Sequence, residues 1–261
     1  MAKWQVGVLV DNLELGVAQG LETAAELGAD GVQIYCTEGE MAPANMDAAA
    51  RKAFRKNLKV LGLALSALCG DTFKGFFDPA TIEDQVRDAK SFIDLAADLG
   101  TDVVTTHFGR FPKDENDPKW EMCFKALREI GKHAASKGVF YASETGLESP
   151  QDLLEFLKKV RSANIKVNYD PANLVHNGFD QVGGVKILKG YIVHTHAKDY
   201  IKGGDETPLG QGDVDYPRYL EALEAIGYKG FLTVERETGN NRVDDVASAI
   251  KYLKSFDRAG K

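Results

Sequence analysis

The sequence contains little cysteine, no surplus of basic residues and no long apolar run. Its three cysteines, Cys36, Cys69 and Cys123, are far apart and odd in number. They suit neither a disulfide framework nor a zinc site, and they favour a reducing cytoplasm. No apolar run reaches transmembrane length and the N-terminus has no apolar signal core, so we expect no membrane attachment. With a net charge of −7 and no basic stripe, we also expect no nucleic-acid binding. A small anionic substrate stays open, because local charge can oppose net charge.

The chain has instead a regular alternation of strand and helix patterns over its 261 residues. The predicted strands are 4–11, 31–35, 61–68, 102–107, 139–144, 165–170, 191–196 and 231–235. The predicted helices are 16–27, 47–60, 81–99, 120–136, 150–163, 181–188, 216–226 and 243–256. Strands that alternate with helices pair in parallel. Eight such units at this length indicate a (β/α)₈ TIM barrel, which we predict to be a single domain over residues 1–261.

Four of the predicted strands end in side chains that can bind a metal ion or move a proton. These side chains are Glu144, Asp170, His196 and Glu235. The two-residue period of a strand points all four toward the barrel axis, with His194 one layer deeper as a structural residue. A closed barrel brings these strand ends together around one axis, so we favour it over an open, doubly wound sheet.

Three carboxylates beside one imidazole repel one another unless a cation lies among them. The four residues therefore predict a divalent-metal site. Oxygen-rich ligation with one histidine favours Mn²⁺, Mg²⁺ or Co²⁺ and suits Zn²⁺ less well. The alternative is that the carboxylates form ordinary ion pairs with Lys166, Lys198 or Arg236. Four such groups at successive strand ends make this alternative the weaker one.

Five segments carry a resemblance to a known family. They are 143–146 (SETG), 168–173 (NYDPAN), 194–199 (HTHAKD), 209–215 (LGQGDVD) and 227–235 (GYKGFLTVE). In this order and combination they resemble the xylose-isomerase-like superfamily of sugar isomerase and epimerase TIM barrels. The resemblance implies that Glu144, Asp170, His196 and Glu235 hold one divalent metal. It further implies that Glu144 and Glu235 move protons, as the matching glutamates do in ketose 3-epimerases. The chain departs from some epimerases at Asn173, where they have a histidine that contacts substrate.

Three further residues are candidates for substrate binding. His107 ends a predicted strand and faces inward, where it contacts a sugar hydroxyl or metal, or is an ordinary core histidine. Asn173 can hydrogen-bond a hydroxyl. Lys198 reaches a substrate oxygen, or forms an ion pair with Asp199 or Glu237.

Two loops leave alternatives open. The segment 209–215 contains Gly210 and Gly212 and follows a strand near which TIM barrels often bind phosphate, although a tight turn explains the glycines equally simply. Free and phosphorylated sugars therefore both stay open. Phe73, Phe76 and Phe77 form an apolar lid over the site or cover helix ends.

The sequence favours a metal-dependent isomerase or epimerase of a ketose, ketose phosphate or related keto-polyol. In that chemistry Glu144 and Glu235, from strands three apart in the ring, act as base and acid on opposite faces of the substrate. The first alternative is a lyase of the inosose or 3-dehydroshikimate dehydratase type on the same scaffold. An abasic-site endonuclease is disfavoured by the acidic net charge and by Asn173, and a non-catalytic sugar-binding protein by the complete ligand set. Self-association into a homo-oligomer stays open.

Overall fold

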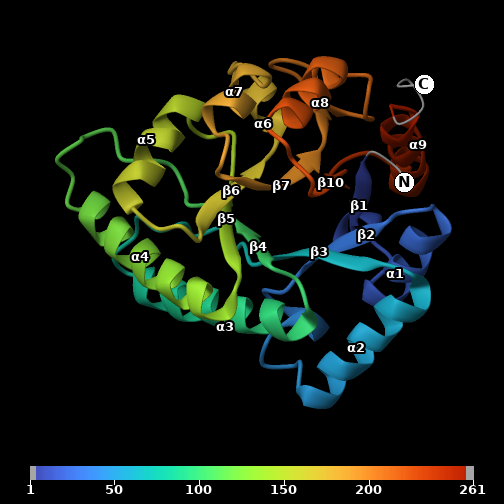
Figure 1. Cartoon of the computed structure of the whole chain (residues 1–261), viewed down its shortest axis with the longest axis horizontal. Coiled ribbons are helices and arrows are strands. Elements are labelled where there is room, and N and C mark those ends of the chain that lie inside the picture. Colours follow the sequence, from blue (N-terminus) through green and yellow to red (C-terminus); the bar gives the residue numbers. More distant parts are fainter. Residues whose placement is uncertain (1–3, 257–261) are drawn as a thin grey trace.

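The barrel strands close into one parallel ring. The computed structural model describes residues 4–256, and the predicted domain limits 1–261 include a few residues at each end that lie outside this range. In ring order the strands are β1 (Gln5–Leu9), β2 (Gly31–Tyr35), β3 (Ala64–Cys69), β4 (Val103–Thr106), β5 (Phe140–Glu144), β6 (Ile165–Tyr169), β7 (Ile192–Ala197) and β10 (Phe231–Val234). Strand β10 pairs with β1 and closes the ring (Figure 1). The predicted (β/α)₈ TIM barrel is therefore confirmed.

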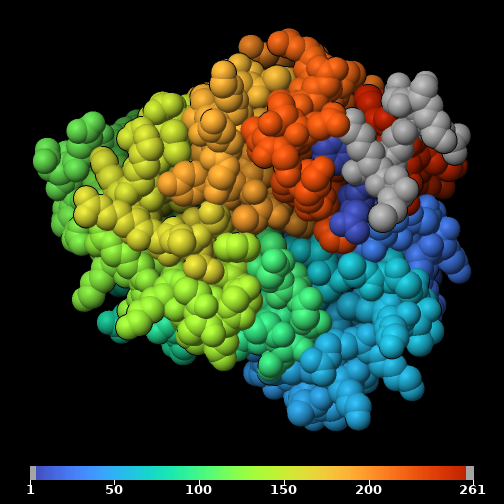
Figure 2. Space-filling model, viewed as in Figure 1, coloured from blue at the N-terminus to red at the C-terminus, as the bar shows by residue number. Residues whose placement is uncertain are grey.

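Helices surround the ring and bury its outer face. They are α1 (Val17–Glu26), α2 (Ala48–Leu61), α3 (Ile82–Leu99), α4 (Lys119–Lys137), α5 (Pro150–Val160), α6 (Pro171–His176), α7 (Gly183–Ile187), α8 (Tyr216–Ala225) and α9 (Arg242–Ser255). Two short 3₁₀ helices, Val10–Leu13 and Gly39–Met41, follow β1 and β2. The space-filling view shows the units following one another around the molecule in chain order (Figure 2). No helix in the described part of the chain is long and apolar enough to cross a bilayer.

The barrel interior changes from apolar to polar along the strands. Small apolar side chains, Ala67, Val103 and Ala142, fill the interior with Val193 against them. Side chains two residues apart in a strand lie on the same face. Glu144 therefore lies one layer beyond Ala142, toward the carboxyl ends of the strands. The apolar layer therefore forms the floor under a polar site.

Besides the two 3₁₀ helices, two elements are absent from the sequence-based prediction. Helix α6 begins directly after β6, because Asp170 accepts hydrogen bonds from Ala172 N at 2.7 Å and Asn173 N at 3.0 Å. Pro171 occupies the first helical turn, where its missing N–H costs nothing. The second element is a small antiparallel hairpin of β8 (Asp199–Tyr200) and β9 (Glu206–Thr207) above the end of β7.

Candidate metal and active site

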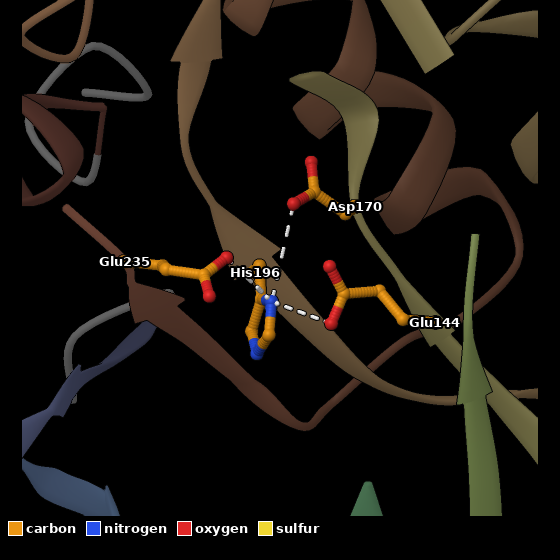
Figure 3. A group of neighbouring side chains, drawn as sticks. All are labelled: Glu144, Asp170, His196 and Glu235. Carbon is orange, nitrogen blue, oxygen red and sulfur yellow. Dashed lines mark ion pairs between the residues drawn. The ribbon is translucent and has the colours of Figure 1, made fainter. Parts of the chain in front are cut away.

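Side chains from four neighbouring strands meet at the carboxyl end of the barrel. Glu144 ends β5, Asp170 follows β6, His196 lies in β7 and Glu235 follows β10. One ligand atom from each lies within 4.8 Å of the others. His196 Nδ1 is 3.0 Å from Glu235 Oε2, 3.3 Å from Glu144 Oε2 and 3.9 Å from Asp170 Oδ2. Figure 3 shows the imidazole between Glu235 on one side and Glu144 and Asp170 on the other. The structure thus brings together all four predicted ligands.

The cluster is buried, and the electrostatics reflect that. Burial raises the pKa of Asp170 to about 7, and the nearby Glu144 charge adds to the effect. Burial also opposes ionisation of Glu235, but His196 and Lys198 outweigh it and hold the pKa of Glu235 well below its usual range. Burial lowers the pKa of His196, yet the charges of Glu235 and Glu144 raise this pKa well above its ordinary value. Without a metal, His196 is therefore the counter-ion of the carboxylates.

Asp170 provides the test of whether the residues fit a metal ion. Its Oδ1 begins helix α6, whereas its Oδ2 is buried and has no hydrogen-bond partner. A buried polar atom without a partner lowers the stability of the fold by about 1–3 kcal/mol when its group is neutral. The cost is larger for a charged carboxylate. This oxygen faces the same space as His196 Nδ1 and the two glutamates. A divalent cation there would satisfy it and offset the repulsion among the carboxylates, so the residues fit such an ion.

Two residues that the sequence analysis missed fix the orientation of the imidazole. Gln33 in β2 donates through Nε2 to Thr105 Oγ1 in β4 at 3.0 Å, which turns its Oε1 toward the histidines. That oxygen lies 3.1 Å from His196 Nε2 and 2.9 Å from His194 Nε2. His196 therefore donates from Nε2 and presents Nδ1 to the carboxylates. A glutamine inside the otherwise apolar strand β2 was the available signal.

His194 is the structural residue that its sequence position predicts. It is fully buried, and burial with the neighbouring His196 charge lowers its pKa well below the ordinary value. It is therefore neutral and donates to Gln33.

The predicted substrate residue His107 lies beside the cluster and is held by a further residue that the sequence analysis missed. Its Nδ1 pairs with Asp71 Oδ2, and its Nε2 lies 3.8 Å from Glu144 Oε1. Burial lowers the pKa of His107, but the Glu144 and Asp71 charges outweigh this and raise it to about 9. His107 is therefore protonated at neutral pH. Asp71 lies two residues beyond the end of β3, so the strand-end rule that found the other acids would also have found it.

Asn173 and Lys198 also contact the two glutamates of the cluster. Asn173 Nδ2 donates to Glu144 Oε1 at 2.7 Å. This approach requires glycine at 146, where φ is +136° and a Cβ would lie 2.5 Å from the Asn173 Cβ. Lys198 Nζ lies 3.4 Å from Glu235 Oε2 and forms an ion pair with Glu237. Of the two ion-pair partners weighed for Lys198, the structure selects Glu237.

Most of these groups border one cavity of about 200 Å³. Its lining includes Glu144, His196, Glu235, His107, Asn173 and Lys198. Asp170 is fully buried behind them. The volume is below the ~300–1,000 Å³ typical of sites for drug-sized ligands and suits a small, highly polar molecule.

The sequence pattern described as "Xylose isomerase-like TIM barrel" matches residues 21–256. The chain belongs to this xylose isomerase-like TIM barrel family. Among solved structures, a xylose isomerase domain protein from Planctomyces limnophilus is 28% identical with a TM-score of 0.85, covering 98% of this chain and 97% of that one. A D-allulose 3-epimerase from Methylomonas sp., solved with D-allulose, is 17% identical with a TM-score of 0.76, covering 98% of each chain. The inosose dehydratase of Glaesserella parasuis is 23% identical over 289 residues, covering 94% of this chain and 96% of that protein.

The sequence leaves open whether Phe73, Phe76 and Phe77 form a lid over the site or cover helix ends, and the structure places the three side chains differently. Phe76 is buried, and Phe77 packs edge-on against Trp120. Only Phe73 borders the cavity, 76% exposed and stacked on Tyr35 with ring centroids 6.4 Å apart. Asp71 links this aromatic to the site, because its Oδ1 accepts from Phe73 N at 2.8 Å while its Oδ2 holds His107.

Gln33 offers a test of the imidazole orientation. We expect Gln33→Leu to weaken Mn²⁺ binding by about 10- to 100-fold, because residues that orient a ligating histidine typically contribute that much. Gln33→Glu keeps an acceptor for His196 Nε2–H and should retain most of the affinity. Calorimetric titration of metal-free protein measures both, with circular dichroism to confirm folding. Wild-type affinity in the folded leucine variant would show that Gln33 does not set the imidazole orientation.

Proposed function

We propose that the protein is a divalent-metal-dependent isomerase or epimerase of a ketose, ketose phosphate or related keto-polyol. The observation that carries this proposal is the placement of two buried carboxylates, Glu144 and Glu235, on opposite sides of one imidazole (Figure 3). Isomerisation through an enediolate moves a proton from one carbon to its neighbour, whereas epimerisation needs a base and an acid on opposite faces of one carbon. The cavity they border is small and mostly polar, as a polyol requires.

Glu144, Asp170, His196 and Glu235 are the proposed ligands, and Mn²⁺, Mg²⁺ or Co²⁺ is favoured over Zn²⁺ by the oxygen-rich set. When bound, the ion supplies Lewis acidity toward the carbonyl and its neighbouring hydroxyl. Lys198 keeps Glu235 ionised, so we assign Glu235 as the base that removes the proton beside the carbonyl. Burial raises the pKa of Glu144, but the charges of His196 and His107 outweigh it and hold this pKa below its ordinary value, so Glu144 rests ionised and returns a proton to the opposite face only after one has been supplied to it. His107 Nε2, 3.8 Å from Glu144 Oε1, is placed to resupply that proton.

His107 also supports the second candidate, a lyase that expels water from a keto-polyol. Loss of a β-hydroxyl needs a proton donor at the leaving oxygen, and His107 is protonated, borders the cavity and is held by Asp71. The inosose dehydratase relative supports this chemistry, whereas the 3-epimerase relative supports the first.

We place the protein in a reducing compartment such as the cytoplasm, because Cys36, Cys69 and Cys123 are free and buried.

The test is proton exchange followed by NMR in D₂O, with Mn²⁺- or Mg²⁺-loaded protein and a panel of ketoses and inososes. Deuterium at carbon with an isomeric product would establish isomerase or epimerase chemistry and identify the carbon. Loss of water to an enone or diketone would instead assign the lyase. The absence of metal-dependent exchange with every compound would contradict both.

A further inference from the structure

The glycine-containing loop 209–215 does not offer its amides to a ligand. The Asp199 carboxylate accepts from Gly210 N at 2.9 Å, Gly212 N at 3.0 Å and Val214 N at 3.1 Å. Glycine at 212 permits this approach, since a Cβ there would lie 2.2 Å from Asp199 Oδ1. A group of backbone N–H donors of this kind is a typical binding site for a phosphate. Here an internal carboxylate fills it, and no residue of the loop lines the cavity in the described structure.

The cationic groups that border the cavity are matched by carboxylates. Lys198 is the one lysine among the described lining residues, and arginine is absent from them. It is 3% exposed and pairs with Glu237 while contacting Glu235. His107 is likewise paired, with Asp71. Neither cation is available to neutralise an anionic substrate without breaking an existing pair.

A bound divalent metal ion would not make the site positively charged. Glu144, Asp170 and Glu235 carry three negative charges against two positive charges on a divalent ion. Because Lys198 is matched by Glu237, the assembled site retains about one negative charge.

The outer part of the cavity is also unfavourable for an anion. Its exposed members include Phe73 and Glu237, with exposed fractions of 76% for the residue and 46% for the side chain. A terminal phosphate on a bound ketose would meet an aromatic ring and a carboxylate there. Aromatic rings suit the C–H faces of an uncharged sugar, whereas the carboxylate repels an anion.

We infer that the site accepts an uncharged polyhydroxy ketone and discriminates against its phosphate ester. This inference rests on the proposed function and narrows its substrate class. It resolves the choice between free and phosphorylated sugars that the sequence leaves open.

Matched pairs test the inference on the metal-loaded wild-type protein: a ketopentose with its 5-phosphate, and a ketohexose with its 6-phosphate. We expect kcat/KM for the free sugar to exceed that for the phosphate by at least about tenfold, from repulsion by one or two carboxylates. Equal or faster reaction of the phosphate overturns the inference and leaves the proposed function standing. If neither member of any pair reacts, the proposed function fails for ketoses. Calorimetric binding then decides the inference: tighter binding of the phosphate, or binding of neither, overturns it.

Glu237→Gln gives a second test at a half-exposed position. Loss of its charge should raise the ratio of kcat/KM for the phosphate to kcat/KM for the free sugar by about three- to tenfold. The reason is that Lys198 loses its ion-pair partner and can then pair with the phosphate. Glu155→Gln is the matched control, since Glu155 pairs with Lys158 on the outside of α5 and does not line the cavity. An unchanged ratio in folded Glu237→Gln would overturn the role given to the Lys198–Glu237 pair.

Discussion

Glu144→Gln and Glu235→Gln each lower product formation by about 10²- to 10⁴-fold, the usual contribution of a positioned acid or base. Glutamine keeps the size of the side chain and one ligand oxygen but can neither accept nor return a proton. Each variant retains one of the two carboxylates that face His196. We therefore expect exchange of a substrate proton with D₂O to survive better than product formation in the Glu144→Gln variant, where the assigned base Glu235 remains.

NMR measures both quantities in the same sample, and metal content is determined in parallel. Glu155→Gln on the exposed face of α5 serves as the control for loss of a carboxylate. A metal-loaded Glu144→Gln protein that exchanges protons and forms product at the wild-type rate would refute the two-carboxylate assignment.

Asp170→Asn should have opposite effects on stability without and with metal. Asparagine can still cap α6 through its oxygen, but it removes a buried charge whose outward oxygen has no hydrogen-bond partner. We expect the metal-free variant to unfold at a higher temperature than the metal-free wild type at neutral pH. With saturating Mn²⁺ the order should reverse. A ligand at about 1,000 times its Kd stabilises the wild type by about 4.1 kcal/mol, and the variant loses most of that gain.

The pH dependence of this difference follows from the pKa of Asp170. Its folded-state pKa is raised to about 7 from an ordinary value of 3.8, chiefly by burial. The folded wild type therefore holds a proton that the unfolded chain releases, and its stability falls as pH rises from about 4 to 7. Three pKa units correspond to about 4 kcal/mol, an upper limit for the advantage of the variant above pH 7. The advantage should vanish below about pH 4.

Thermal unfolding from pH 4 to 8, with chelator or with Mn²⁺, measures these effects. Asp47→Asn is the matched control, because Asp47 also caps a helix, α2, but at an exposed position away from the cluster. A metal response in Asp170→Asn equal to that of the wild type would exclude Asp170 as a ligand.

The sequence predicts the barrel and the ligand cluster because both depend on local periodicity. Apolar strands that alternate with amphipathic helices define the ring, and a strand period of two places Glu144 and Glu235 on its inner face. Gln33 and Asp71 stand out locally by residue type and position, but the partners that they contact carry no such signal. Gln33 meets His196, 163 residues away in the sequence, and Asp71 meets His107 because the neighbouring strands β3 and β4 place their ends side by side. Similarly, glycines in a loop do not reveal that Asp199 already occupies their amides.

Asp170 begins a helix with one oxygen and faces the other ligands with its second. The helix it begins carries Asn173, which contacts Glu144. An engineer who exchanged Asp170 for glutamate or histidine to change the preferred metal would also move or unwind the first turn of α6. Glu144 and Glu235 stand at no helix start, and their exchange carries no such penalty. A change at Asp170 would therefore alter the proposed metal site and the position of Asn173 together, through the first turn of α6.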